Sequence, residues 1–213
     1  MEREGLQRRQ SSHFSLLRSY QMADLLTLAN ACAGMASILL MISYLLAPDP
    51  WRVILALGLL PVALGCDVVD GFVARRRHQH SEFGQELDSL ADIVSFGVAP
   101  VVIAYGAGMR GGWDALIFLF FVACGISRLA RFNITAAVLS DATGKVRYFE
   151  GTPIPSSVLL VLILAGCFSM GVVGDQLPLG VVTLASIHWH PLSLLYLAHG
   201  CAMVSKTLRI PKP

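Results

Sequence analysis

The chain contains 213 residues, of which 55% are hydrophobic and only 14% are charged, whereas soluble domains carry about 25% charged residues. The mean hydropathy of +0.65 is high, and the net charge of +2 is the small difference between 16 basic and 14 acidic residues. This composition argues against a soluble globule, a disordered segment and a nucleic-acid-binding protein, and it indicates a protein embedded in a membrane.

The first 21 residues are polar and basic, and they lack the long apolar core of a signal peptide. Phe14, Leu16, Leu17 and Tyr20 could form the apolar face of a short helix lying on the membrane surface. A disordered tail that leads into such a helix is an equally good interpretation. We therefore expect residues 1–21 to be a cytosolic tail, with or without an interfacial amphipathic helix.

Apolar stretches separated by proline, glycine or charged residues fill the rest of the chain. A membrane-spanning helix needs about 20 apolar residues, and the stretch between Asp24 and Asp49 offers that length without a charge. We predict an all-α membrane bundle of about six transmembrane helices, which together form a catalytic domain over residues 22–206 before a short cytosolic tail at 207–213. The predicted helices cover residues 22–47, 51–77, 86–109, 112–138, 154–174 and 190–206.

Basic residues are distributed unequally between the two ends of the predicted helices. With six spans, both termini and two of the connecting loops face one side of the membrane. Of the 16 basic residues, only Arg52 and Arg110 lie on the opposite side. Because basic residues are retained on the cytosolic side, we predict that both termini are cytosolic.

Four aspartates intrude into the second and third predicted helices, where charged groups are costly and indicate function. Asp67 and Asp70 share one face of their helix, as do Asp88 and Asp92, and a rise of about 1.5 Å per residue places both pairs in the cytosolic half of the membrane. Like charges repel, so divalent cations such as Mg²⁺ or Mn²⁺ would compensate them, and two such ions could bind a diphosphate. Ion pairing with Arg75–Arg77 at the membrane surface is the alternative.

The acids belong to one pattern that extends over two predicted helices. It reads Asp67-x2-Asp70-Gly71-x2-Ala74-Arg75-x8-Gly84-x3-Asp88-x3-Asp92. At every position it resembles the signature of the CDP-alcohol phosphotransferase family of integral membrane enzymes. Gly71 and Ala74 would let a nucleotide approach the backbone, and Gly84 would let the connecting loop turn tightly. Close helix packing is another use for such small residues.

Further stretches resemble the members of this family, in fungi and bacteria, that use serine as the acceptor. They are residues 26–34, 87–100, 124–133, 148–156 and 199–213, of which the last is most similar to the fungal form. The resemblance implies the CDP-alcohol phosphotransferase fold and transfer of a phosphatidyl group from CDP-diacylglycerol to L-serine, with release of CMP. It also implies a homodimer surrounded by membrane lipids, in the endoplasmic reticulum of a eukaryote or the inner membrane of a bacterium.

The resemblance assigns roles to the residues of the pattern. Asp67, Asp70 and Asp88 would bind two Mn²⁺ or Mg²⁺ ions, and Asp92 would share metal binding and take the proton from the serine hydroxyl. For Thr27 and Asn30, in the first predicted helix, an interhelical hydrogen bond is as good an interpretation as nucleotide contact. The expected CDP-binding residues are Thr27, Asn30, Asp67, Gly71, Ala74, Arg75 and Gly84.

Serine carries a carboxylate, which choline, ethanolamine and inositol lack. Arg128 and Arg131 lie on one face of the fourth predicted helix at the depth of the acids, and a guanidinium can bind a carboxylate through two hydrogen bonds. We predict that at least one of them contacts serine, with Phe132 and Ser95 as weaker candidates for the same pocket. Alternatively, the arginines neutralise the aspartates or reach lipid headgroups.

Other acceptors remain open at this point, namely glycerol 3-phosphate, inositol phosphate or an amino alcohol. A transporter that moves cations along its intramembrane acids is disfavoured, because such sites lie near the midplane on repeated helices. No internal repeat is visible, and the acids are predicted at one edge. His188 and His190 are predicted on the opposite side, with an interfacial role beside Trp189.

Overall fold

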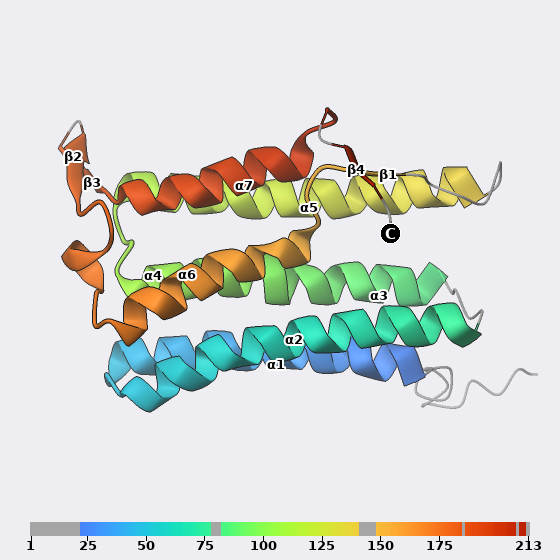
Figure 1. Ribbon diagram of the computed structural model, residues 1–213, viewed down its shortest axis with the longest axis horizontal. Helices are drawn as coiled ribbons and strands as arrows, with labels where there is room; N and C mark the ends of the chain where they lie inside the picture. The colour runs from blue at the N-terminus through green and yellow to red at the C-terminus, as the bar shows by residue number, and fades with distance from the viewer. Residues whose placement is uncertain (1–21, 78–81, 141–147, 185, 208, 212–213) are drawn as a thin grey trace, which may run out of the picture.

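The computed structural model describes residues 22–77, 82–140, 148–184, 186–207 and 209–211 (Figure 1). The tail predicted over residues 1–21 lies outside these ranges, and so does part of the C-terminal tail. Mostly helical rods run along the long axis of the molecule. The predicted helical bundle is therefore confirmed.

Six rods account for the six predicted spans. Without water in a bilayer, backbone groups must be satisfied within the segment, and helices achieve this. The third rod is continuous, although its middle part is a π-helix. The rods are α1 (Met22–Leu46), α2 (Pro50–Arg77), α3 (Glu82–Asp92) with η1 (Ile93–Val98) and α4 (Ala99–Ala107), α5 (Gly112–Ser140), η2 (Ile154–Ser157) with α6 (Val158–Ser169), and η4 (Pro191–Ser193) with α7 (Leu194–Val204).

Four of these rods are long and apolar enough to cross a membrane, and two are shorter apolar helices. The chain is accordingly an integral membrane protein. The long candidates are Met22–Leu46, Pro50–Ala74, Phe83–Ala107 and Gly112–Thr135, and the shorter helices are Ile154–Ser169 and Pro191–Val204. The last two are shorter than predicted, because α6 ends at Ser169 and α7 at Val204.

The rods form layers in Figure 1, with α1 and α2 on one side, the α3–α4 rod and α6 in the middle, and α5 and α7 on the other side. Met41, Phe96, Phe121 and Tyr196 are fully buried between the layers. The Ser37 hydroxyl donates a hydrogen bond to the Ala56 carbonyl at 2.7 Å and joins α1 to α2. Large apolar side chains cover the outside, as expected for a surface in contact with lipid.

Two pairs of short strands accompany the helices, and the sequence analysis did not predict them. At one end, β2 (Val182–Leu184) pairs antiparallel with β3 (Ile187–Trp189). Alongside α5 and beyond the end of α7, β1 (Tyr148–Glu150) pairs antiparallel with β4 (Arg209–Pro211), so part of the predicted C-terminal tail is paired (Figure 1). Each strand has only three residues, which is too short for a hydrophobic period to appear in the sequence.

Gly108 shows why the third rod ends where it does. Its φ of +118° suits glycine, and a side chain there would collide with the backbone of Gly174. The chain can therefore turn sharply from α4 into α5. This turn places the start of α5 at the end of the molecule that carries the β2–β3 hairpin (Figure 1).

Candidate active site

Three aspartates meet between α2 and α3. Asp67 and Asp70 lie on α2 and Asp88 on α3, and each offers a carboxylate oxygen within 4.8 Å of the other two. Asp70 is buried, and Oδ1 of Asp88 is buried without a hydrogen-bond partner among the described residues. Such a set of hard oxygen atoms fits a divalent cation, which would relieve the mutual repulsion of the carboxylates.

Asp92 lies one helical turn beyond Asp88 and is only 6% exposed. The negative charge of Asp92 is repelled by those of Asp67 and Asp88, so Asp92 belongs to the same acidic cluster. Arg128, on α5, attracts both Asp67 and Asp92. The structure therefore brings together the four predicted aspartates and one of the two predicted arginines.

Helix α1 supplies a hydrogen-bond donor to one acid of each pair. The Thr27 hydroxyl donates to Oδ2 of Asp70 at 2.7 Å, and the Asn30 amide donates to Oδ1 of Asp92 at 3.3 Å. Both donors are buried. These contacts are the interhelical hydrogen bonds of the alternative interpretation, and they place Thr27 and Asn30 directly beside the candidate metal ligands.

A π-helix follows Asp92 immediately, and nothing in the sequence analysis predicted it. Its backbone is fastened by side chains from two other rods. Ser95 Oγ donates to the Asn30 carbonyl at 2.9 Å, and Ser157 Oγ donates to the Phe96 carbonyl at 2.7 Å. π-Helical turns are frequent at functional sites, and this one fixes the rod directly behind a candidate catalytic carboxylate.

Close approach of α1 to the π-helix requires a residue without a side chain. A Cβ atom at Gly34 would lie 2.6 Å from Cα of Ser95, which is closer than two carbon atoms can pack. This approach brings Asn30 within reach of both Ser95 and Asp92. Ser95 is fully buried, and its hydroxyl is hydrogen-bonded to α1. Contact between Ser95 and the substrate serine stays a prediction.

The two predicted arginines point to different partners. Arg128 acts on the acids, its guanidinium lies 6.0 Å from the centre of the Phe132 ring, and its Nε has no hydrogen-bond partner within the described ranges. Arg131 instead donates to the carbonyl of Val204 at the end of α7, at 3.5 Å. Arg128 is thus the arginine whose position favours contact with a substrate at the acids.

Three other residues of the predicted CDP site lie on the same two helices. Gly71 and Ala74 are half-buried on the part of α2 that follows Asp70. Gly84 lies inside α3, which begins at Glu82, so the prediction that it forms a tight connecting turn is wrong. A glycine near the start of a helix can be read as a loop residue, because local sequence marks helix ends poorly. The side chain of Arg75 lies outside the described part of the chain.

Sequence reasoning missed a polar contact between η2 and α7. Oγ of Ser156 lies 2.8 Å from Nε2 of His199, and the His199 ring packs 5.7 Å from the ring of Phe121 on α5. Arg128 acts electrostatically on His199 as well as on the acids. A histidine inside an apolar predicted helix was the available signal, but its partner lies 43 residues away.

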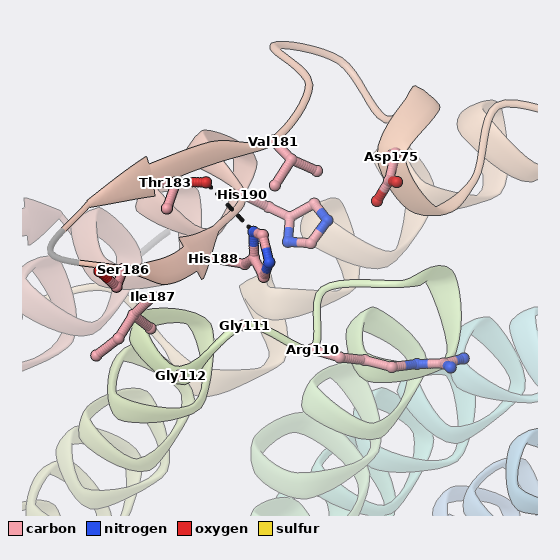
Figure 2. Close-up of a pocket in the computed structure, with 10 residues that line it drawn as sticks. All are labelled: Arg110, Gly111, Gly112, Asp175, Val181, Thr183, Ser186, Ile187, His188 and His190. Carbon is pink, nitrogen blue, oxygen red and sulfur yellow. Dashed lines mark hydrogen bonds between the residues drawn. The ribbon is translucent and has the colours of Figure 1, made fainter.

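The opposite end of the molecule holds a cavity of about 650 Å³ under the β2–β3 hairpin (Figure 2). His188 and His190 both line it, together with Arg110 and Asp175. His190 is only 4% exposed and its Nδ1 lies 2.6 Å from Oδ2 of Asp114, and the interfacial role beside Trp189 stays a prediction. This buried pair joins the start of α5 to the segment before α7.

Comparison with known proteins agrees with the geometry. The family model of CDP-alcohol phosphatidyltransferases matches residues 20–198. The chain is 45% identical over 204 residues to the CDP-diacylglycerol–serine O-phosphatidyltransferase of Saccharomyces cerevisiae, and this match covers 94% of the chain and 74% of the yeast protein.

Two archaeal proteins are also similar. A CDP-diacylglycerol–serine O-phosphatidyltransferase of Methanocaldococcus jannaschii is 33% identical over 70% of the chain, and an archaetidylserine synthase of Methanothermobacter thermautotrophicus is 37% identical over 70% of it. The matches span 62% and 60% of these two proteins. With its signature, its helical bundle and its acidic cluster, the chain belongs to the CDP-alcohol phosphatidyltransferase family.

Proposed function

We propose that this chain is a CDP-diacylglycerol–serine O-phosphatidyltransferase. It transfers the phosphatidyl group of CDP-diacylglycerol to the hydroxyl of L-serine and releases CMP. One observation carries the proposal. Three aspartates of the family signature, Asp67, Asp70 and Asp88, have carboxylate oxygens within 4.8 Å of one another, in a chain 45% identical to the yeast enzyme of that name.

Asp67, Asp70 and Asp88 would hold a divalent cation, Mn²⁺ or Mg²⁺, and Asp92 would take part in holding a second. Oδ1 of Asp88 supports this assignment, because it is buried and has no hydrogen-bond partner among the described residues. A buried carboxylate oxygen needs a hydrogen-bond donor or a cation. When bound, the cations neutralise charge on the diphosphate and polarise its phosphorus–oxygen bonds.

Asp92 would act as the general base. Since the Asn30 amide binds its Oδ1, Oδ2 is the oxygen left to accept the proton of the serine hydroxyl. The serine oxygen then forms a bond to the phosphorus that carries diacylglycerol, and the bond from that phosphorus to the CMP oxygen breaks. Phosphatidylserine and CMP are the products, and the proton remains on Asp92 until solvent removes it.

Arg128 would bind the serine carboxylate, since it lies beside Asp67 and Asp92 and its Nε has no partner among the residues described. The nucleotide would lie along α1 and α2, against Thr27, Asn30, Gly71, Ala74, Arg75 and Gly84. We expect the site and both termini to face the cytosol, and the protein to be a homodimer. The membrane would be the endoplasmic reticulum of a eukaryote or the inner membrane of a bacterium.

Incorporation of radiolabelled serine into chloroform-soluble lipid tests the proposal on the purified full chain. The product should require both CDP-diacylglycerol and Mn²⁺ or Mg²⁺, and CMP should appear in equal amount. Asp67→Asn should abolish the reaction, whereas Asp49→Asn, in the α1–α2 loop, should not, because Asp49 pairs only weakly with Arg52 at 3.9 Å. A lipid product with another alcohol but none with serine would reassign the acceptor.

A further inference from the structure

Two polar side chains close to Arg128, His199 and Ser156, have no role in the reaction as described so far. His199 lies on α7, Ser156 on η2 and Arg128 on α5. The His199 and Ser156 side chains are in contact, and the His199 ring packs against Phe121, which lies two helical turns before Arg128 on the same face of α5. Arg128 in turn acts electrostatically on His199, Asp92 and Asp67. These groups therefore border the same site as the aspartates.

The contact between Ser156 and His199 determines which ring nitrogen carries the proton. A serine hydroxyl has one hydrogen, and Ser156 donates it to the Pro153 carbonyl at 2.6 Å. Oγ can then only accept a hydrogen bond from Nε2 of His199, at 2.8 Å. In the neutral imidazole the lone pair consequently resides on Nδ1.

Nδ1 of His199 is a buried acceptor without a partner among the described residues, and Nε of Arg128 is a buried donor in the same condition. Buried polar groups in proteins are almost always paired, so an unpaired acceptor beside an unpaired cationic donor calls for a ligand. The ligand that complements this combination carries a carboxylate for the guanidinium and an N–H donor for the imidazole. An α-amino acid has both groups on one carbon atom.

We propose that His199 determines the choice of acceptor by accepting, at Nδ1, a hydrogen bond from the α-ammonium group of the amino acid, while Arg128 binds its carboxylate. This inference rests on the proposed function and adds a residue to it. Ser156 is then a positioning residue, since it holds the ring in the required tautomer. Glycerol 3-phosphate and inositol phosphate have no ammonium group to offer Nδ1.

Two substitutions of His199 test the roles of its two ring nitrogens separately. The amide of His199→Gln reaches the place of Nε2 and retains a donor for Ser156, but it removes the acceptor at Nδ1. The shorter amide of His199→Asn lies near the place of Nδ1 and retains that acceptor. With saturating CDP-diacylglycerol, His199→Gln should raise the KM for L-serine about tenfold or more, the usual effect of losing a hydrogen bond to a charged group. His199→Asn should stay closer to wild type, and the KM for CDP-diacylglycerol should change in neither variant.

A serine analogue without the amine provides the decisive comparison. 3-Hydroxypropionate retains the carboxylate and the hydroxyl group, so its inhibition constant should be the same for wild type and His199→Gln. An unchanged KM for serine in His199→Gln would overturn the inference. So would an equal rise in the serine KM and the 3-hydroxypropionate constant, because the ring would then only shape the pocket.

The two proposals fail in distinguishable ways. Absence of serine-labelled lipid from the wild-type protein would overturn the proposed function. In that case, equilibrium dialysis of radiolabelled serine measures its affinity for the wild type and for His199→Gln without any turnover. Equal affinities for the two proteins, or no binding by either, would overturn the inference about His199. Equal melting temperatures of the variants in the same detergent show that folding is preserved.

Discussion

Substitution of Thr27 by valine tests whether α1 helps to build the proposed metal site. Valine has the shape of threonine but lacks the hydroxyl group that donates to Oδ2 of Asp70 at 2.7 Å. The same hydroxyl lies 3.1 Å from the Ala23 carbonyl, but its single hydrogen favours the closer, charged acceptor. Thr27 and Asp70 are 4% and 5% exposed, so water cannot replace the lost donor without rearrangement.

A buried hydrogen bond to a charged group contributes about 1.5–3 kcal/mol. Tenfold in affinity corresponds to about 1.4 kcal/mol. If the bond orients Asp70 for the cation, Thr27→Val should weaken Mn²⁺ binding about 10- to 100-fold, as is usual for groups that orient metal ligands. The affinity is measured by electron paramagnetic resonance titration of free Mn²⁺ in the purified, detergent-solubilised protein.

Thr27→Ser is the matched control, because it retains the hydroxyl group and should bind Mn²⁺ as the wild type does. A Thr27→Val protein with unchanged Mn²⁺ affinity would refute the reasoning. The hydrogen bond would then serve only to pack α1 against α2. A loss of affinity in both variants would point to packing of the threonine methyl group.

Three further predictions concern the acids, the arginines and the far end of α5. Asp88→Asn should raise the melting temperature in EDTA, because it removes one of several mutually repelling charges, and Mn²⁺ should no longer stabilise the variant. Arg128→Lys should raise the KM for serine at least about tenfold, since lysine cannot form the bidentate contact, whereas Arg131→Lys should change it little. Asp114→Asn should lower the free energy of unfolding by about 1–3 kcal/mol, because it weakens the buried contact with His190, and should leave both substrate KM values unchanged.

Each of these expectations can fail separately. A lower melting temperature of Asp88→Asn in EDTA would mean that the carboxylate stabilises the fold without metal. Equal effects of lysine at positions 128 and 131 on the serine KM would contradict the separation of the two arginines. An altered KM in the Asp114→Asn protein would show that the two ends of α5 are coupled.

Much of the architecture could be predicted because it depends on local properties. Charge-free apolar stretches predict membrane helices, and the positions of those helices agree with the structure to within a few residues at most ends. The spacing of Asp67 and Asp70, and of Asp88 and Asp92, places each pair on one helix face whatever the rest of the chain does. Close contact between Asp67, Asp70 and Asp88 then follows once α2 and α3 pack together.

Other features depend on contacts between distant segments and were therefore missed. The hairpin of β2 and β3 consists of strands too short for a recognisable pattern. The sequence predicts Gly84 in a loop, but α3 begins before it, at Glu82. Arg128 and Arg131 share a helix face, so their spacing predicts similar partners for both. The position of α7 makes the partners differ, because Arg131 donates a hydrogen bond to the end of that helix.

The sequence by itself determined that this is a membrane protein with paired aspartates on two of its helices, because residue spacing along a helix sets which charges share a face and hydropathy sets which segments enter lipid. The resemblance of the signature around those aspartates indicated the family. Only the tertiary structure decided how the acids are held and what lies beside them. Thr27 and Asn30 reach Asp70 and Asp92 from α1, and Ser156 orients His199 from a separate segment. Such hydrogen bonds arise from the packing of helices that are far apart in the chain, and no periodicity within one helix encodes them.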